Sequence, residues 1–206
     1  MLSILIEGLV FGLSLAVSLG PIFIALTQTS IEKGVWPGMT VGLGIWVSDF
    51  IILGLFYKFI YEIKDQIQGD TFRFWLGISG VLIMVGFGLY LIMRAPIVDY
   101  SKQKHTYKSY LGFWLKGFLI NTINPFTIFF WLGVISTYII GRDLPVKGHI
   151  VLFSTILAVI ILSDSGKVLL ADYLKSRLTA KHINTISNFS GAILVGFGIF
   201  LGYQVI

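Results

Sequence analysis

Two aspartates stand out in this sequence because both fall inside long apolar stretches. Asp49 lies near the middle of residues 38–57, and Asp164 lies within residues 146–170, each directly after a serine. An ionised carboxylate at the centre of a bilayer costs about 2.5–3.5 kcal/mol on insertion scales, so such residues usually serve ion or substrate binding. We therefore expect Asp49 and Asp164 to bind protons, and Asp49 also to bind a cationic group of a substrate.

Each aspartate also has a structural interpretation, which stays open. Lys167 follows Asp164 by three residues on the same helix face, so a local ion pair would satisfy both charges. For Asp49, the structural alternative is a hydrogen-bonded carboxylate that caps an opened helix.

Two prolines interrupt other apolar stretches at equivalent places, at Gly20-Pro21 and at Asn124-Pro125. Proline lacks an N–H and clashes with the carbonyl four residues earlier, so each helix is expected to bend or break there. In a bilayer the freed backbone groups must face protein or a water-filled cavity. The plainer alternative is that both prolines are packing kinks, which are common in membrane helices. We predict a substrate site at the two breaks, formed by Ser18, Gly20, Pro21, Asp49, Asn121, Asn124 and Pro125.

The composition is that of an integral membrane protein. Hydrophobic residues make up 56% of the 206 residues, and charged residues 12%, against about 25% in soluble domains. There is no cysteine, which excludes disulfides, thiolate metal sites and an intramembrane electron carrier that works through paired thiols. No basic stripe with interleaved aromatics is present, so nucleic acid is not an expected partner.

Six stretches are long enough to cross about 30 Å of hydrocarbon, which takes roughly 20 helical residues. Backbone groups that face lipid must be paired within their own segment, so these stretches are predicted to be helices. The expected fold class is therefore an all-α integral membrane protein with six transmembrane helices, at residues 2–30, 38–57, 72–93, 112–140, 146–170 and 183–205.

The two halves of the chain resemble each other. The third and sixth stretches read SGVLIMVGFGLYL and SGAILVGFGIFL, the first and fourth share the proline, and the second and fifth share Ser-Asp. Because three spans per half is an odd number, the second half must be inverted relative to the first. Inverted repeats with matching interrupted helices indicate a transporter whose site lies between the repeats. We predict a first three-helix repeat at 1–94, a cytoplasmic linker at 95–110 and an inverted repeat at 111–206.

The basic residues predict which side of the membrane each loop occupies. Placing both termini outside puts eight lysines and arginines in the inner loops and five in the outer ones. We therefore expect both termini outside. The inner set is Lys33, Arg94, Lys102, Lys104, Lys108, Lys175, Arg177 and Lys181, and the outer set is Lys58, Lys64, Arg73, Arg142 and Lys147.

Other candidate sites are few. His105, His149 and His182 are all expected in loops, so no metal site and no cofactor is predicted. No nucleophile with a neighbouring base and no phosphate loop is apparent, so the chain is not expected to be an enzyme. Glycines four residues apart are compatible with close helix contacts or with a homodimer, at Gly8/Gly12, Gly38/Gly42 and Gly198/Gly202.

With these motifs the chain resembles the lysine exporter (LysE/RhtB) family of bacterial amino-acid efflux proteins over nearly its whole length. The matching segments are SLGP at 18–21, GLGIWVSD at 42–49 and INPFTIFFW at 123–131. The resemblance implies a multi-pass exporter in the bacterial cytoplasmic (inner) membrane, an antiporter driven by proton exchange, with a dimer as a compatible state.

The chain departs from the family pattern at two places. Leu19 precedes Gly20-Pro21 where the family usually reads Pro-Gly-Pro. Phe129 and Phe130 stand where the exporters of basic amino acids carry an acidic residue. The resemblance thus implies a neutral amino acid or a related small metabolite as substrate.

Two alternatives to an amino-acid exporter remain. A metal-ion exporter would need more carboxylates, histidines or thioethers within the spans than Asp49 and Asp164. A non-transporting membrane scaffold would have no water-accessible midplane, which solvent labelling of engineered cysteines would reveal.

Overall fold

The computed structural model describes residues 1–17, 20–93, 110–142, 144–175 and 180–205. Within these ranges the backbone is almost entirely helical and contains no strand, which confirms the predicted all-α class. Ser18 and nearly all of the predicted linker at 95–110 lie outside the described residues.

The first half of the chain forms α1 (Leu2–Val17), α2 (Pro21–Lys33), α3 (Val35–Gln68) and α4 (Asp70–Met93). Gly34 alone separates α2 from α3. Its φ of 96° lies in the left-handed region, where a side chain would be strained, so glycine suits this reversal.

The second half forms α5 (Tyr110–Ile123), α6 (Pro125–Ile135), the π-helix η2 (Ser136–Ile140), α7 (Val146–Leu174) and α8 (Ala180–Val205). The expectation that the histidines fall in loops is wrong for two of them. His149 lies in the first turn of α7 and is buried, and His182 lies in α8. His105 is outside the described residues.

Both predicted helix breaks are present at the prolines. The axes of α1 and α2 differ by 66°, and those of α5 and of α6 with η2 differ by 61°. Gly20 and Asn124 are extended, with φ and ψ of −122° and −159°, and of −70° and 112°. Pro21 and Pro125 then open α2 and α6, where the missing N–H costs nothing.

Among the described residues, two helices are long and apolar enough to cross a membrane alone, Val35–Ile60 and Val146–Leu174, and counting each of the two bent pairs as one span gives up to four. The apolar parts of α4 and α8 are shorter within the described residues, at Gly77–Met93 and Ser187–Phe200. These helices make the chain a multi-pass membrane protein. The number of six spans stays a prediction.

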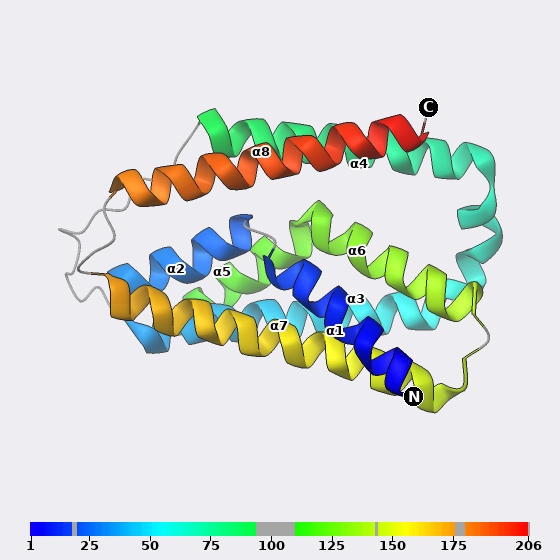
Figure 1. Cartoon of the computed structure of the whole chain (residues 1–206), viewed down its shortest axis with the longest axis horizontal. Helices are drawn as coiled ribbons and strands as arrows, with labels where there is room; N and C mark the ends of the chain where they lie inside the picture. The colour runs from blue at the N-terminus through cyan, green and yellow to red at the C-terminus, as the bar shows by residue number, and fades with distance from the viewer. Residues whose placement is uncertain (18–19, 94–109, 143, 176–179, 206) are drawn as a thin grey trace.

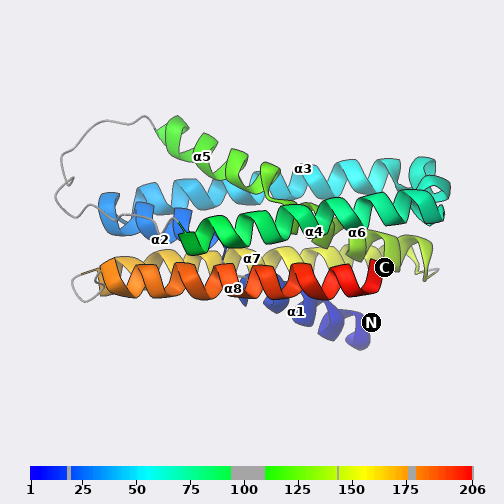
Figure 2. The same ribbon diagram turned by 90° about the horizontal axis from the view of Figure 1, so that it is seen from above.

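The helices lie roughly along one long axis, and the most extensive contacts join the two halves of the chain (Figures 1 and 2). Helix α1 packs on α7, α3 packs on α5, and α4 packs on α8. The two termini lie at the same end of the molecule, opposite the end where α4 finishes and α8 begins (Figure 1).

Glycines set how closely these pairs approach. A Cβ at Gly44 on α3 would lie 2.0 Å from the carbonyl oxygen of Trp114 on α5, and one at Gly117 would lie 2.0 Å from that of Val41. Both clashes exclude any larger residue, so the backbones of α3 and α5 touch. Gly8 and Gly12 likewise face α7, so glycines predicted from their spacing make contacts inside the chain.

Candidate functional site

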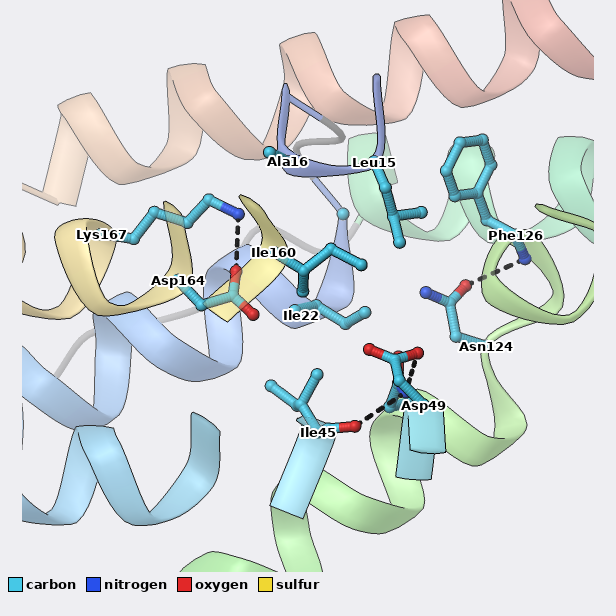
Figure 3. A pocket seen from close by; sticks show the side chains of 12 residues that line it. Leu15, Ala16, Ile22, Ile45, Asp49, Asn124, Phe126, Ile160, Asp164 and Lys167 are labelled. Atoms are coloured by element: carbon cyan, nitrogen blue, oxygen red, sulfur yellow. Dashed lines mark hydrogen bonds and ion pairs between the residues drawn. The ribbon is translucent and has the colours of Figure 1, made fainter. Parts of the chain in front are cut away.

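A small cavity lies where the starts of α2 and α6 meet α3, α5 and α7. Its volume is about 20 Å³, room for about one water molecule. Figure 3 shows the side chains that surround it. The lining residues are Leu15, Ala16, Gly20, Ile22, Ile45, Asp49, Asn121, Asn124, Phe126, Ile160, Asp164 and Lys167.

Most of the predicted site residues converge on this cavity. Those that line it are Gly20, Asp49, Asn121, Asn124 and Asp164. Pro21 and Pro125 contribute the helix breaks beside it, as the first residues of α2 and α6. Ser18 belongs to the residues that are not described.

Asp49 is only 1% exposed, and one of its two carboxylate oxygens has no hydrogen-bond donor among the described residues. Its Oδ1 accepts hydrogen bonds from Nδ2 of Asn121 at 2.9 Å and from Nε1 of Trp131 at 3.0 Å. In the described part of the chain, Oδ2 accepts none. Hydrogen bonds to a carboxylate are stronger than those between neutral groups, so the two donors hold Asp49 in place and leave Oδ2 free.

Asn121, on α5, connects the carboxylate on α3 to α6, the other half of its own interrupted helix pair. Its Nδ2 also donates to the carbonyl oxygen of Ile45 at 3.2 Å, and its Oδ1 accepts from the hydroxyl of Thr127 at 3.0 Å. Both ends of the amide are therefore committed, because the nitrogen can only donate and the oxygen can only accept. This sets which end of Asn121 faces Asp49.

Asp164 is tied more completely than Asp49. Lys167 donates to its Oδ1 at 2.8 Å and Nε1 of Trp46 donates to its Oδ2 at 3.2 Å. Each oxygen thus has a donor. The local ion pair that the spacing of Asp164 and Lys167 suggests is formed, and it borders the cavity.

Helices α2 and α6 both present their N-termini to the cavity, but only that of α6 is capped by a side chain. Asn124 caps α6, because its Oδ1 accepts from the backbone N–H of Phe126 at 3.1 Å. Gly20 cannot cap α2 with a side chain, and the first N–H groups of a helix have no acceptor within it. The partial positive charge of the α2 N-terminus therefore lies next to Gly20 and Ile22 in the cavity wall.

Sequence reasoning missed the aromatic donors of this site. Trp131 and Trp46 each donate an indole N–H to an aspartate, and neither was predicted. A usable signal existed for Trp131, which follows Thr127 by four residues and so shares its helix face. The apolar lining from Leu15, Ile22, Ile45 and Ile160 carries no comparable signal.

Comparison with known proteins gives one family and one relative. The model of the LysE type translocator family matches residues 13–205. Over 209 residues the chain is 28% identical to the protein named "Putative amino acid efflux protein YcgF" of Bacillus subtilis (strain 168), covering 98% of this chain and 97% of that protein. No solved structure matches the chain.

Proposed function

The chain belongs to the LysE type translocator family, and we propose that it is a secondary transporter that exports amino acids across a bacterial cytoplasmic membrane in exchange for protons. The observation that carries this proposal is the uncommitted oxygen of Asp49, which faces a cavity between interrupted helices. The name of the Bacillus subtilis relative supports amino acids as the substrate class.

The proposed architecture is six crossings arranged as two inverted three-helix repeats, at 1–94 and 111–206, joined by a cytoplasmic linker at 95–110. The packing supports it. A twofold exchange of the halves turns the α1–α7 contact into the α5–α3 contact and returns α4–α8 to itself, and all three are the main contacts of the fold. The Lys/Arg bias supports termini on the outside, and both termini lie at one end (Figure 1).

The substrate's ammonium group would bind Asp49, while its carboxylate would approach the uncapped N-terminus of α2 near Gly20. Both partners border one cavity, so a zwitterion could contact them together. Most of the other lining residues are apolar, which favours an amino acid with an uncharged side chain. Since the cavity now holds about one water, binding requires it to widen toward one side of the membrane, as alternating access does.

Proton exchange follows if a proton and the ammonium group compete for Asp49. The cavity has no second acidic oxygen without a donor among the described residues, so the two cations would exclude each other there. Proton coupling at Asp164 stays a prediction. Its two oxygens have donors, and proton uptake there would require the pair with Lys167 to open.

The test is flux in proteoliposomes that contain the purified protein, a panel of labelled amino acids and an imposed pH gradient. We expect Asp49→Asn to lose at least roughly tenfold of the gradient-driven flux, because a hydrogen bond to a charged group contributes about 1.5–3 kcal/mol. Asp172→Asn is the matched control, since that carboxylate pairs with Lys175 away from the cavity. Unchanged flux in Asp49→Asn would remove Asp49 from the mechanism.

A scaffold without transport would show no flux in the wild type. Because the chain has no cysteine, a single cysteine at Ile160 in the cavity wall would report on water access directly. A transporter predicts labelling by a membrane-impermeant thiol reagent that an added substrate slows, whereas a scaffold predicts none.

A further inference from the structure

Lys167 is a partly buried cation in the cavity wall that the proposed exchange at Asp49 does not use. Its side chain is 13% exposed and extends from α7 toward the cavity. Figure 3 shows Lys167 and Asp49 on opposite sides of Ile22 and Ile160. The wall of one cavity therefore holds a cation and a carboxylate with apolar side chains between them.

Lys167 and Asp164 differ in how many hydrogen-bonding positions they have left for a ligand. Asp164 is fully occupied, because Lys167 and Trp46 each donate to one of its oxygens. The ammonium group of Lys167 has three donor positions, and within the described residues Asp164 is its hydrogen-bond partner. Lys167 thus retains donors for a ligand, while Asp164 does not retain an acceptor.

Location distinguishes this pair from an ordinary helix ion pair. Lys175 and Asp172 have the same spacing at the C-terminal end of α7 and a contact of 3.0 Å, but their side chains are 45% and 26% exposed and do not line the cavity. Such pairs need no ligand, since water solvates them. Placing a lysine within a membrane costs free energy, and such residues usually take part in binding or transport.

The cavity wall offers an opposite charge to each end of a zwitterion. With all groups ionised, Asp164 and Lys167 cancel, and Asp49 adds one negative charge. The ammonium group of a ligand would offset the charge of Asp49, while Lys167 has as its counterion a carboxylate whose two oxygens already have donors. An additional carboxylate, brought by the ligand, completes its coordination.

We propose that Lys167 binds the carboxylate of the transported amino acid while Asp49 binds its ammonium group, and that Asp164 and Trp46 position Lys167. This rests on the proposed function and adds to it the residue that recognises the carboxylate, which restricts the substrates to amino acids with a free carboxylate. The flexible four-carbon stem of lysine allows it to follow the substrate as the cavity opens. The α2 N-terminus adds partial positive charge to the wall of the same cavity.

The test compares amino acids with their carboxamides, which keep the ammonium group but lose the carboxylate. Binding of uncharged L-amino acids and the matching amides to purified full-length protein is measured by thermal stabilisation. We expect the wild type to prefer the acid by at least roughly tenfold, as loss of a charge-assisted bond implies. Lys167→Met should reduce this preference to less than about threefold by weakening the acid and not the amide.

Three further variants keep the test decisive. Lys167→Arg should retain the preference, because the cation remains. Asp164→Asn combined with Lys167→Met leaves no unpaired buried charge, so it addresses the site even if the single variant fails to fold, and it should lose the preference. Lys175→Met is the control and should behave like the wild type.

The two proposals fail in different ways. If the wild type binds and exports amino acids but Lys167→Met or the double variant keeps the full preference for the acid, the role of Lys167 is refuted and export stands. If the wild type neither binds nor exports any amino acid in the panel, the proposed function and the role of Lys167 are refuted together.

Discussion

Replacement of Gly44 by alanine should lower the stability of the fold and weaken a hydrogen bond of Asp49, because it pushes α3 away from α5. The added Cβ would lie 2.0 Å from the carbonyl oxygen of Trp114, and ordinary contact begins near 3.4 Å. The backbones of α3 and α5 must therefore separate locally by about 1.4 Å. Five residues along α3, Asp49 accepts a hydrogen bond of 2.9 Å from Asn121 on α5. The same separation would lengthen that bond beyond hydrogen-bonding distance.

The expected cost is about 2–5 kcal/mol in the free energy of unfolding. It combines overpacking of about 1–3 kcal/mol with loss of a hydrogen bond to a carboxylate worth about 1.5–3 kcal/mol. The better helix propensity of alanine offsets about 0.5–1 kcal/mol of this. Reversible unfolding in mixed detergent micelles measures the free energy, and amino-acid flux measures the site.

Gly54→Ala is the matched control on the same helix. A Cβ there meets nothing within 4 Å, so this variant should be neutral or slightly stabilised and should transport normally. If Gly44→Ala unfolds like Gly54→Ala and keeps its flux, the close approach of α3 and α5 is not what holds Asp49 in position.

Two further substitutions test the polar groups of the site. Trp131→Phe removes one donor to Asp49 and should cost about 1.5–3 kcal/mol of unfolding free energy. In an Asp49→Asn background this cost should be smaller. Equal costs in both backgrounds would show that the two side chains are not coupled. Asn124→Ala removes the α6 cap and should cost about 1 kcal/mol, whereas Asn124→Ser should retain most of the stability because serine caps equally well. A serine variant as unstable as the alanine variant would rule out capping as the role of Asn124.

The features predicted correctly from sequence are those that depend on local chemistry. The breaks before Pro21 and Pro125 follow from the missing N–H of proline, and the pair of Asp164 with Lys167 follows from helical spacing. The all-α class follows from the apolar stretches. Each of these needs only residues that are close in the chain.

The features that were missed depend on how distant segments meet. Trp131 donates to Asp49 because α6 passes α3, and the two residues are 82 positions apart. His149 was expected in a loop, but α7 begins directly after Pro145 and includes it. Its burial comes from packing next to Tyr138, whose carbonyl oxygen lies 3.2 Å from Nε2 of His149. Neither contact can be read from a single segment.

The pairing of α1 with α7, α3 with α5 and α4 with α8 also determines the order in which the protein can assemble. Synthesis proceeds from the N-terminus, so α1, α3 and α4 are all made before their most extensive partners exist. Gly44 of α3 has no neighbouring helix to contact until α5 is made, and α4 lacks its partner until α8 is made. The helices of the first half are thus made as an incomplete unit, and the tertiary structure closes only once α8 has been made.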